Sequence, residues 1–101
     1  MEKGIIEDTF LLINKDFELQ STGQVELEEQ LLALLQPIIQ YMLNREFERL
    51  LQICYRIDLD ENKLKYILNE SDPEQMAVEL AEAIIKRQIK KVEIRRKYSQ
   101  S

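Results

Sequence analysis

Apolar residues recur every three or four positions over most of this chain, which is the spacing of one face of an α-helix. The strongest patterns predict a helix over residues 24–43 and a long helix over residues 72–98. Weaker stripes predict shorter helices over residues 45–57 and 60–69. Residues 1–20 favour a helix, although they alternate well enough to allow a short extended arm. The pattern therefore predicts an all-α chain.

Polar residues and a proline between these stripes predict where the helices begin and bend. The segment 71–74, Ser-Asp-Pro-Glu, has the pattern of a capping box in front of the last helix. The segment 58–61, in which an acid precedes a glutamate by three positions, is a second capping pattern, and Asn44 is expected to cap the third helix. Pro37 removes a backbone hydrogen bond inside a predicted helix, so we expect a kink or a break near Gln36.

Length and composition indicate one globular domain over residues 1–101. A chain of 101 residues can build one hydrophobic core but not two. Apolar residues make up 45% of the chain, with two glycines and two prolines, so it can bury enough surface to fold. We therefore expect a compact bundle of four or five helices with a long C-terminal helix.

Targeting signals and cysteine content indicate a cytoplasmic protein. No stretch approaches the roughly 18 to 20 apolar residues that a membrane-spanning helix needs. Residues 1–8 carry acids where a signal or transit peptide would carry basic residues. The single cysteine, Cys54, lies in an apolar helical segment and is expected to be a buried, unreactive thiol.

Charge is strongly separated along the chain. Residues 1–85 hold seven Lys and Arg against 18 Asp and Glu, a formal charge of −11, whereas residues 86–101 hold seven against one, a charge of +6. The apolar stripe of the last helix narrows beyond Ile89, so we expect this basic end to project from the bundle. It could bind phosphates, or meet an acidic surface of this chain or of a partner. The candidate basic patch consists of Lys86, Arg87, Lys90, Lys91, Arg95, Arg96 and Lys97.

The residue types that most enzymes use are missing from this sequence. It contains no histidine, which removes the common proton-transfer residue, the Ser-His and Cys-His pairs, and histidine-bearing metal sites. Its two glycines stand apart, so no phosphate-binding loop is present. We therefore expect no catalytic residue and no cofactor, and we expect that the protein is not an enzyme.

Two acidic patterns come nearest to a metal site. Residues 58–69 open like a calcium-binding loop but lack its central glycine and final glutamate. Glu28 with Glu29, and Glu79 with Glu82, have the helical spacing of carboxylates that bind magnesium in some hydrolases. A solvated helix face explains these pairs better, so no metal site is expected, and a carboxylate-metal hydrolase is the last of three functional alternatives.

Two short motifs carry a resemblance to known proteins. Residues 55–58, Tyr-Arg-Ile-Asp, followed by Glu61, and residues 84–91, Ile-Ile-x-Arg-Gln-x-x-Lys, resemble small all-helical bacterial proteins of uncharacterised function. The similarity covers residues 30–96. It implies an all-helical fold and brings no activity with it.

Wide apolar faces and a polarised last helix favour protein–protein interaction as the function. We expect a self-associating helical module, such as a dimer about a two-fold axis that sets the basic end against the acidic body. The alternative is a nucleic-acid or nucleoprotein accessory factor that acts through residues 86–97. For each interface candidate, an ordinary place in the core or on the surface is the competing interpretation. The candidate anchors are Tyr41, Tyr55, Ile89, Val92 and Tyr98.

Overall fold

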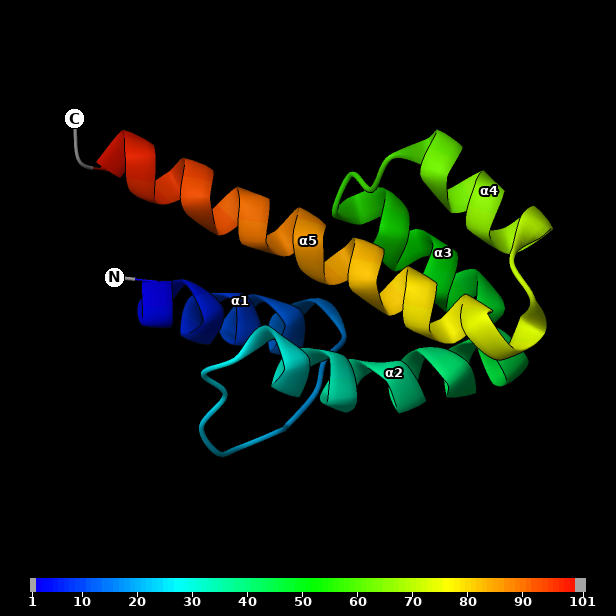
Figure 1. Ribbon diagram of the computed structural model, residues 1–101, viewed down its shortest axis with the longest axis horizontal. Coiled ribbons are helices and arrows are strands. Elements are labelled where there is room, and N and C mark those ends of the chain that lie inside the picture. The colour runs from blue at the N-terminus through cyan, green and yellow to red at the C-terminus, as the bar shows by residue number, and fades with distance from the viewer. Residues whose placement is uncertain (1, 100–101) are drawn as a thin grey trace.

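The computed structural model describes residues 2–99, which form helices and connections without a strand. The predicted all-α fold with a long last helix is thereby confirmed, and the first segment is a helix rather than an extended arm. In this part of the chain the helices are α1 (Glu2–Asp16), α2 (Glu28–Arg45), α3 (Phe47–Arg56), α4 (Glu61–Glu70) and α5 (Pro73–Ser99) (Figure 1).

The long helix α5 organises the bundle. It packs against α1, α2 and α4, and α3 packs against α2, within overall dimensions of 41 × 29 × 20 Å. Figure 1 shows α3 and α4 beside the first half of α5, and α1 beside its second half. None of the helices in residues 2–99 has both the length and the apolar character to cross a bilayer. Large side chains that are fully buried include Ile13, Leu31, Leu35, Ile39, Leu50, Ile53, Ile67, Leu80 and Ile84.

The start of α5 differs from the predicted capping box. Ser71 ends α4, where its N–H donates to the carbonyl of Ile67, and its hydroxyl donates to Glu79 Oε1 at 2.8 Å. The backbone carbonyl of Asp72 accepts the first bonds of α5, from the N–H groups of Gln75 and Met76. The capping-box prediction was therefore wrong, because a side chain two turns into α5 binds the Ser71 hydroxyl.

The cap of α4 lies two residues later than predicted. Asp60 Oδ1 accepts from the N–H groups of Asn62, at 2.9 Å, and Lys63, at 3.4 Å. Asp58 does not cap the helix, because its backbone adopts the left-handed conformation, φ 64°, and its carboxylate pairs with Arg87. The choice between two nearby acids depends on this backbone turn.

Helix α2 begins later and ends later than its apolar pattern suggests. Its first turn begins at Glu28 and is capped by Gln30, whose Oε1 accepts hydrogen bonds from the N–H groups of Glu26 and Leu27. At its other end, Asn44 lies inside the last turn and does not cap the next helix, because Glu46 alone joins α2 to α3. The helix also passes Pro37 without a break. Pro37 and Ala33 are both exposed, so the carbonyl that loses its bond can be hydrated.

Candidate interaction surface on the last helix

At Arg87, helix α5 passes from a half that buries Leu80, Ile84 and other apolar residues to a half with more exposed side chains. There, Arg87 Nε donates to the carbonyl of Ile57 at 3.1 Å, and Nη2 lies 3.4 Å from Asp58 Oδ2. These contacts attach α5 to the connection between α3 and α4. Beyond this point, Figure 1 shows α1 as the helix that accompanies α5.

Helix α1 packs against one side of the second half of α5. Gln88 is fully buried, and its Nε2 donates to Asp16 Oδ2. Val92 is also buried, and Arg96 Nη2 donates to Asp8 Oδ2 at 2.7 Å. The prediction that this end projects from the bundle was therefore wrong for the side that faces α1. Its polar residues have partners on a helix more than 70 positions away in the sequence, which periodicity within α5 could not reveal.

The opposite side of the same half exposes two large apolar residues. Ile94 is 41% exposed and Tyr98 is 75% exposed, one helical turn apart. They lie on the same side of α5 as the buried residues Leu80 and Ile84, but the apolar stripe is interrupted between them because positions 87 and 91 hold Arg and Lys. Cationic side chains flank both residues along the helix. We call this surface the cationic face, and it consists of Lys90, Lys91, Ile94, Arg95, Lys97 and Tyr98.

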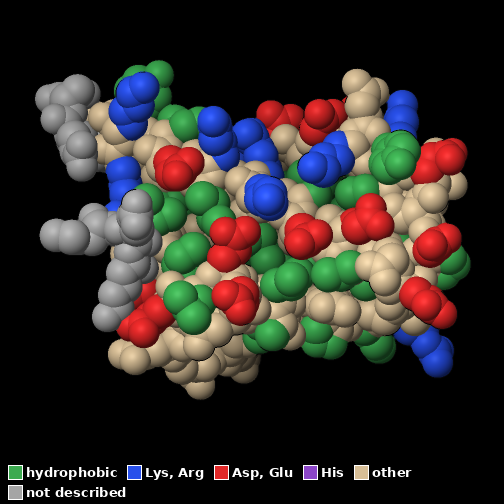
Figure 2. All heavy atoms as spheres, viewed as in Figure 1, with side chains coloured by type: hydrophobic (Ala, Val, Ile, Leu, Met, Phe, Trp, Pro, Cys, Tyr) green, Lys and Arg blue, Asp and Glu red, His purple; other side chains and the backbone are tan. Residues whose placement is uncertain are grey.

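Lys91 of the cationic face is affected by burial and by several charged neighbours. Burial and then the nearby Arg87 lower the pKa of Lys91 below its usual value, Asp16 opposes the shift, and Arg95 adds to it. In Figure 2, Lys and Arg side chains gather along the upper edge, where this half of α5 lies, and Asp and Glu spread over most of the same view.

A second surface also combines apolar and charged side chains, but its charge is negative. Between the start of α2 and the middle of α5 lies a depression of about 320 Å³. Leu32 and Ile85 supply its apolar lining, and Glu28, Glu29 and Glu82 supply its carboxylates. Within the described part of the chain, none of these three carboxylates is ion-paired. We call it the acidic depression.

The five candidate anchors occupy four different environments. Tyr41 and Tyr55 are exposed on α2 and α3, and Ile89 is partly buried against the core. Val92 is buried and belongs to the hydrophobic core of the single chain. Tyr98 alone of the five lies on the cationic face.

Ile94 is an exposed apolar residue that the sequence did not single out. Its apolar spacing fits a core position as well as a surface one, so only its neighbours in space could assign it. Among the seven residues of the basic patch, Arg87 and Arg96 form ion pairs with Asp58 and Asp8 of the same chain. Part of the basic end therefore meets an acidic surface of its own chain, which was one of the expected uses.

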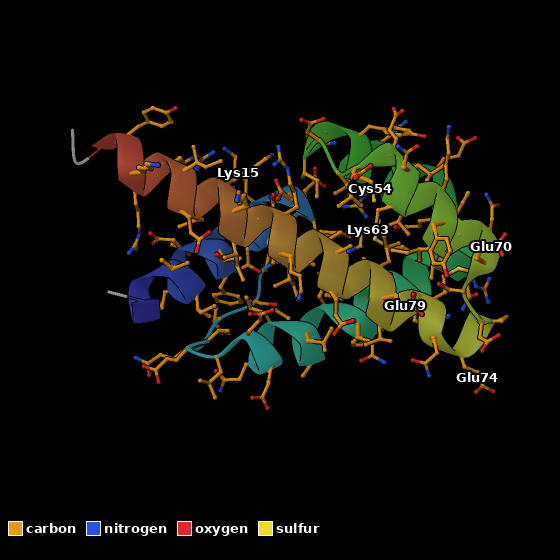
Figure 3. The ribbon with its side chains drawn as sticks, turned by 45° about the horizontal axis from the view of Figure 1, so that its top comes forward. Lys15, Cys54, Lys63, Glu70, Glu74 and Glu79 are labelled. Atoms are coloured by element: carbon orange, nitrogen blue, oxygen red, sulfur yellow. The ribbon has the colours of Figure 1, made fainter. Side chains whose placement is uncertain are left out.

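The structure also locates the residues considered for chemistry. Cys54 is fully buried, as predicted, and this burial raises the pKa of its thiol to about 11. Glu79 shares a depression of about 260 Å³ between α4 and α5 with Lys63, and both side chains are labelled in Figure 3. Among residues whose side chains are described, no three of His, Cys, Asp and Glu gather as a metal site.

Each of the two surfaces combines apolar residues with side chains of one charge, and the two charges are opposite. Comparison with known proteins gave no match, because no family model, no curated protein and no solved structure matches this chain.

Proposed function

We propose that this protein is a non-catalytic interaction module that associates with further copies of itself through the cationic face of α5. The observation that carries the proposal is the exposure of Ile94 and Tyr98 in the middle of a ring of cations. Binding hot spots combine a buried aromatic or aliphatic centre with a polar rim in this way.

The free energies that the cationic face can contribute predict a weak, salt-sensitive association. An aromatic side chain can bury on the order of 150–250 Å², so covering the exposed three-quarters of Tyr98 would contribute roughly 3–4 kcal/mol. Association itself costs at least about 4 kcal/mol. Tyr98 alone therefore does not suffice, and Ile94 and the charged rim must supply the remainder. We expect a dissociation constant in the micromolar to millimolar range, which corresponds to roughly 4–8 kcal/mol.

Charge separation supports another copy as the partner. Residues 1–85 carry a formal charge of −11, so a second copy presents an acidic surface to the cationic face. A nucleic-acid accessory factor is the alternative. It is less well supported because Arg87 and Arg96 are already paired with carboxylates and because the acidic body repels a polyanion.

Solution mass tests the proposal. Sedimentation equilibrium or light scattering is measured over a range of protein concentrations at about 50 mM and about 500 mM salt. We expect the average mass to exceed the monomer mass of 12.1 kDa at low salt and to fall toward it at high salt. The double variant Ile94→Ser with Tyr98→Ser should remain monomeric. Tyr66→Ser is the matched control, because Tyr66 is 63% exposed on α4, outside the cationic face.

Two results would contradict the proposal. A wild-type chain that is monomeric at every concentration and salt would remove self-association. Titration of a fluorescent single-stranded oligonucleotide then tests the alternative, and binding that weakens steeply with salt would favour a nucleic-acid factor. Equal loss of association in the Tyr66→Ser control would show that the cationic face has no special part in it.

A further inference from the structure

We infer that the cationic face of one copy docks into the acidic depression of the next copy, in a head-to-tail contact. The inference rests on the proposed self-association and adds the surface on the second copy that receives α5. Both halves of this contact are present on each chain. Ile94 and Tyr98 are exposed, and the hollow that would receive them is lined by the partly buried Leu32 and the buried Ile85.

The two surfaces are complementary in charge, and each contains an accessible apolar side chain. The acidic depression brings Glu28, Glu29 and Glu82 together with the partly buried Leu32. The cationic face places four cations beside an isoleucine and a tyrosine. Docking would cover Ile94 and Tyr98 with Leu32 and would set carboxylates opposite ammonium and guanidinium groups. The carboxylates of the depression are available for this purpose, since they make no ion pair with the described residues of their own chain.

Two other hollows fit the cationic face less well. The groove between α1 and α5, of about 310 Å³, contains the carboxylate of Asp8, but Lys15 and Arg96 also line it and would repel the cationic face, and Arg95 of that face is part of the same lining. The hollow of about 390 Å³ where α2, α3, α4 and α5 meet is lined by apolar and amide side chains such as Phe47 and Asn69, without a carboxylate. The acidic depression is the one of these hollows that combines an apolar lining with several carboxylates and no cation.

The positions of the two surfaces determine the mode of association. Ile85 and Ile94 are nine positions apart on α5, or about two and a half helical turns, so they point to opposite sides of the helix. A two-fold contact would need both surfaces on one side, whereas a head-to-tail contact leaves one free surface of each kind at the ends. The inferred contact therefore differs from the two-fold dimer expected from the sequence, and its assemblies grow with concentration.

Complementary variants test this contact. The first variant replaces Glu28, Glu29 and Glu82 by glutamine, which keeps a normal cationic face but weakens the depression. The second is Ile94→Ser with Tyr98→Ser, which keeps a normal depression but weakens the cationic face. We expect each variant alone to associate about tenfold more weakly than wild type, because the first loses the carboxylates that face the cations and the second loses the apolar side chains of the contact. An equal mixture should form a one-to-one heterodimer and nothing larger, because only one intact contact can be made.

A matched control and two outcomes decide the inference. The control replaces Glu48, Glu61 and Glu70, which are exposed outside the depression, by glutamine, so that the net charge changes equally. It should associate like wild type. If wild type associates but the mixture stays monomeric, or the depression variant associates normally, the docking site is overturned while the proposed self-association stands. If wild type itself is monomeric throughout, both are overturned.

Discussion

The contact between Gln88 and Asp16 should behave asymmetrically when either partner is removed. Gln88 is fully buried, its Nε2 donates to Asp16 Oδ2, and its Oε1 has no hydrogen-bond partner in the structure. Asp16→Ala would leave both polar atoms of a buried amide without partners. Hydrogen bonds to charged groups contribute about 1.5–3 kcal/mol, so we expect a loss of about 2 kcal/mol in the free energy of unfolding.

Removing the amide instead should cost much less. Gln88→Leu replaces the buried polar group with an apolar side chain of similar size, and the Asp16 carboxylate, which is partly exposed, can be hydrated. We expect this variant to lie within about 1 kcal/mol of wild type. Once Gln88 is leucine, adding Asp16→Ala should change the stability little. The double-mutant cycle should therefore give a coupling energy of about 2 kcal/mol.

Urea unfolding followed by circular dichroism measures all four proteins. A shift of 1 kcal/mol corresponds to roughly 4–8 °C in Tm for a domain of this size, so thermal unfolding gives an independent reading. Asp16→Asn is a further control, because its amide oxygen can still accept the hydrogen bond. A cost below about 0.5 kcal/mol for Asp16→Ala, or additive effects of the two substitutions, would show that the Gln88–Asp16 hydrogen bond does not stabilise the fold.

Three further predictions concern single sites. Burial raises the pKa of Cys54 from 9.0 to about 11, so stability that is complete below pH 9 should fall as pH rises toward 11, by about 2 kcal/mol. Urea unfolding of wild type and Cys54→Ala across this range should show their difference changing by that amount, and a constant difference would contradict it. Asp60→Ala removes the side-chain cap of α4 and should cost about 1 kcal/mol in urea, whereas Asp60→Asn should cost little; equal losses would exclude capping as the cause. Pro37→Ala restores a backbone donor in the exposed middle of α2 and should raise the free energy of unfolding by about 1–2 kcal/mol. An unchanged Tm for this variant would contradict the prediction.

Local pattern determined which parts of this chain are helical. A helix needs only a repeating apolar face and suitable residue types within a few turns, so positions such as Leu31, Leu35 and Ile39 indicated α2 and its buried side correctly. Helix ends were less predictable. Ser71 and Asn44 both have side chains that can cap a helix. The Ser71 hydroxyl instead donates to Glu79 on the next helix, and Asn44 lies within α2, which continues past it.

Candidate surface residues divide in the same way. The concentration of cations at the end of the chain and the choice of Tyr98 as a candidate anchor follow from residue types alone. The exposure of Ile94, the burial of Val92 and the gathering of Glu28 with Glu82 do not. Each of these depends on which helix lies beside which, and periodicity within one helix carries no record of its neighbours.

By itself, the amino-acid sequence determined the all-α class, the approximate extent of the helices and the separation of charge along the chain. Tertiary structure decided which side of α5 is open. It joined Asp16 to Gln88 and Asp8 to Arg96, pairs that lie 72 and 88 positions apart, and so covered one side of the basic end with α1. Contacts over such separations form only when whole helices pack together, which is why local patterns specify the helices but not the surface that remains exposed.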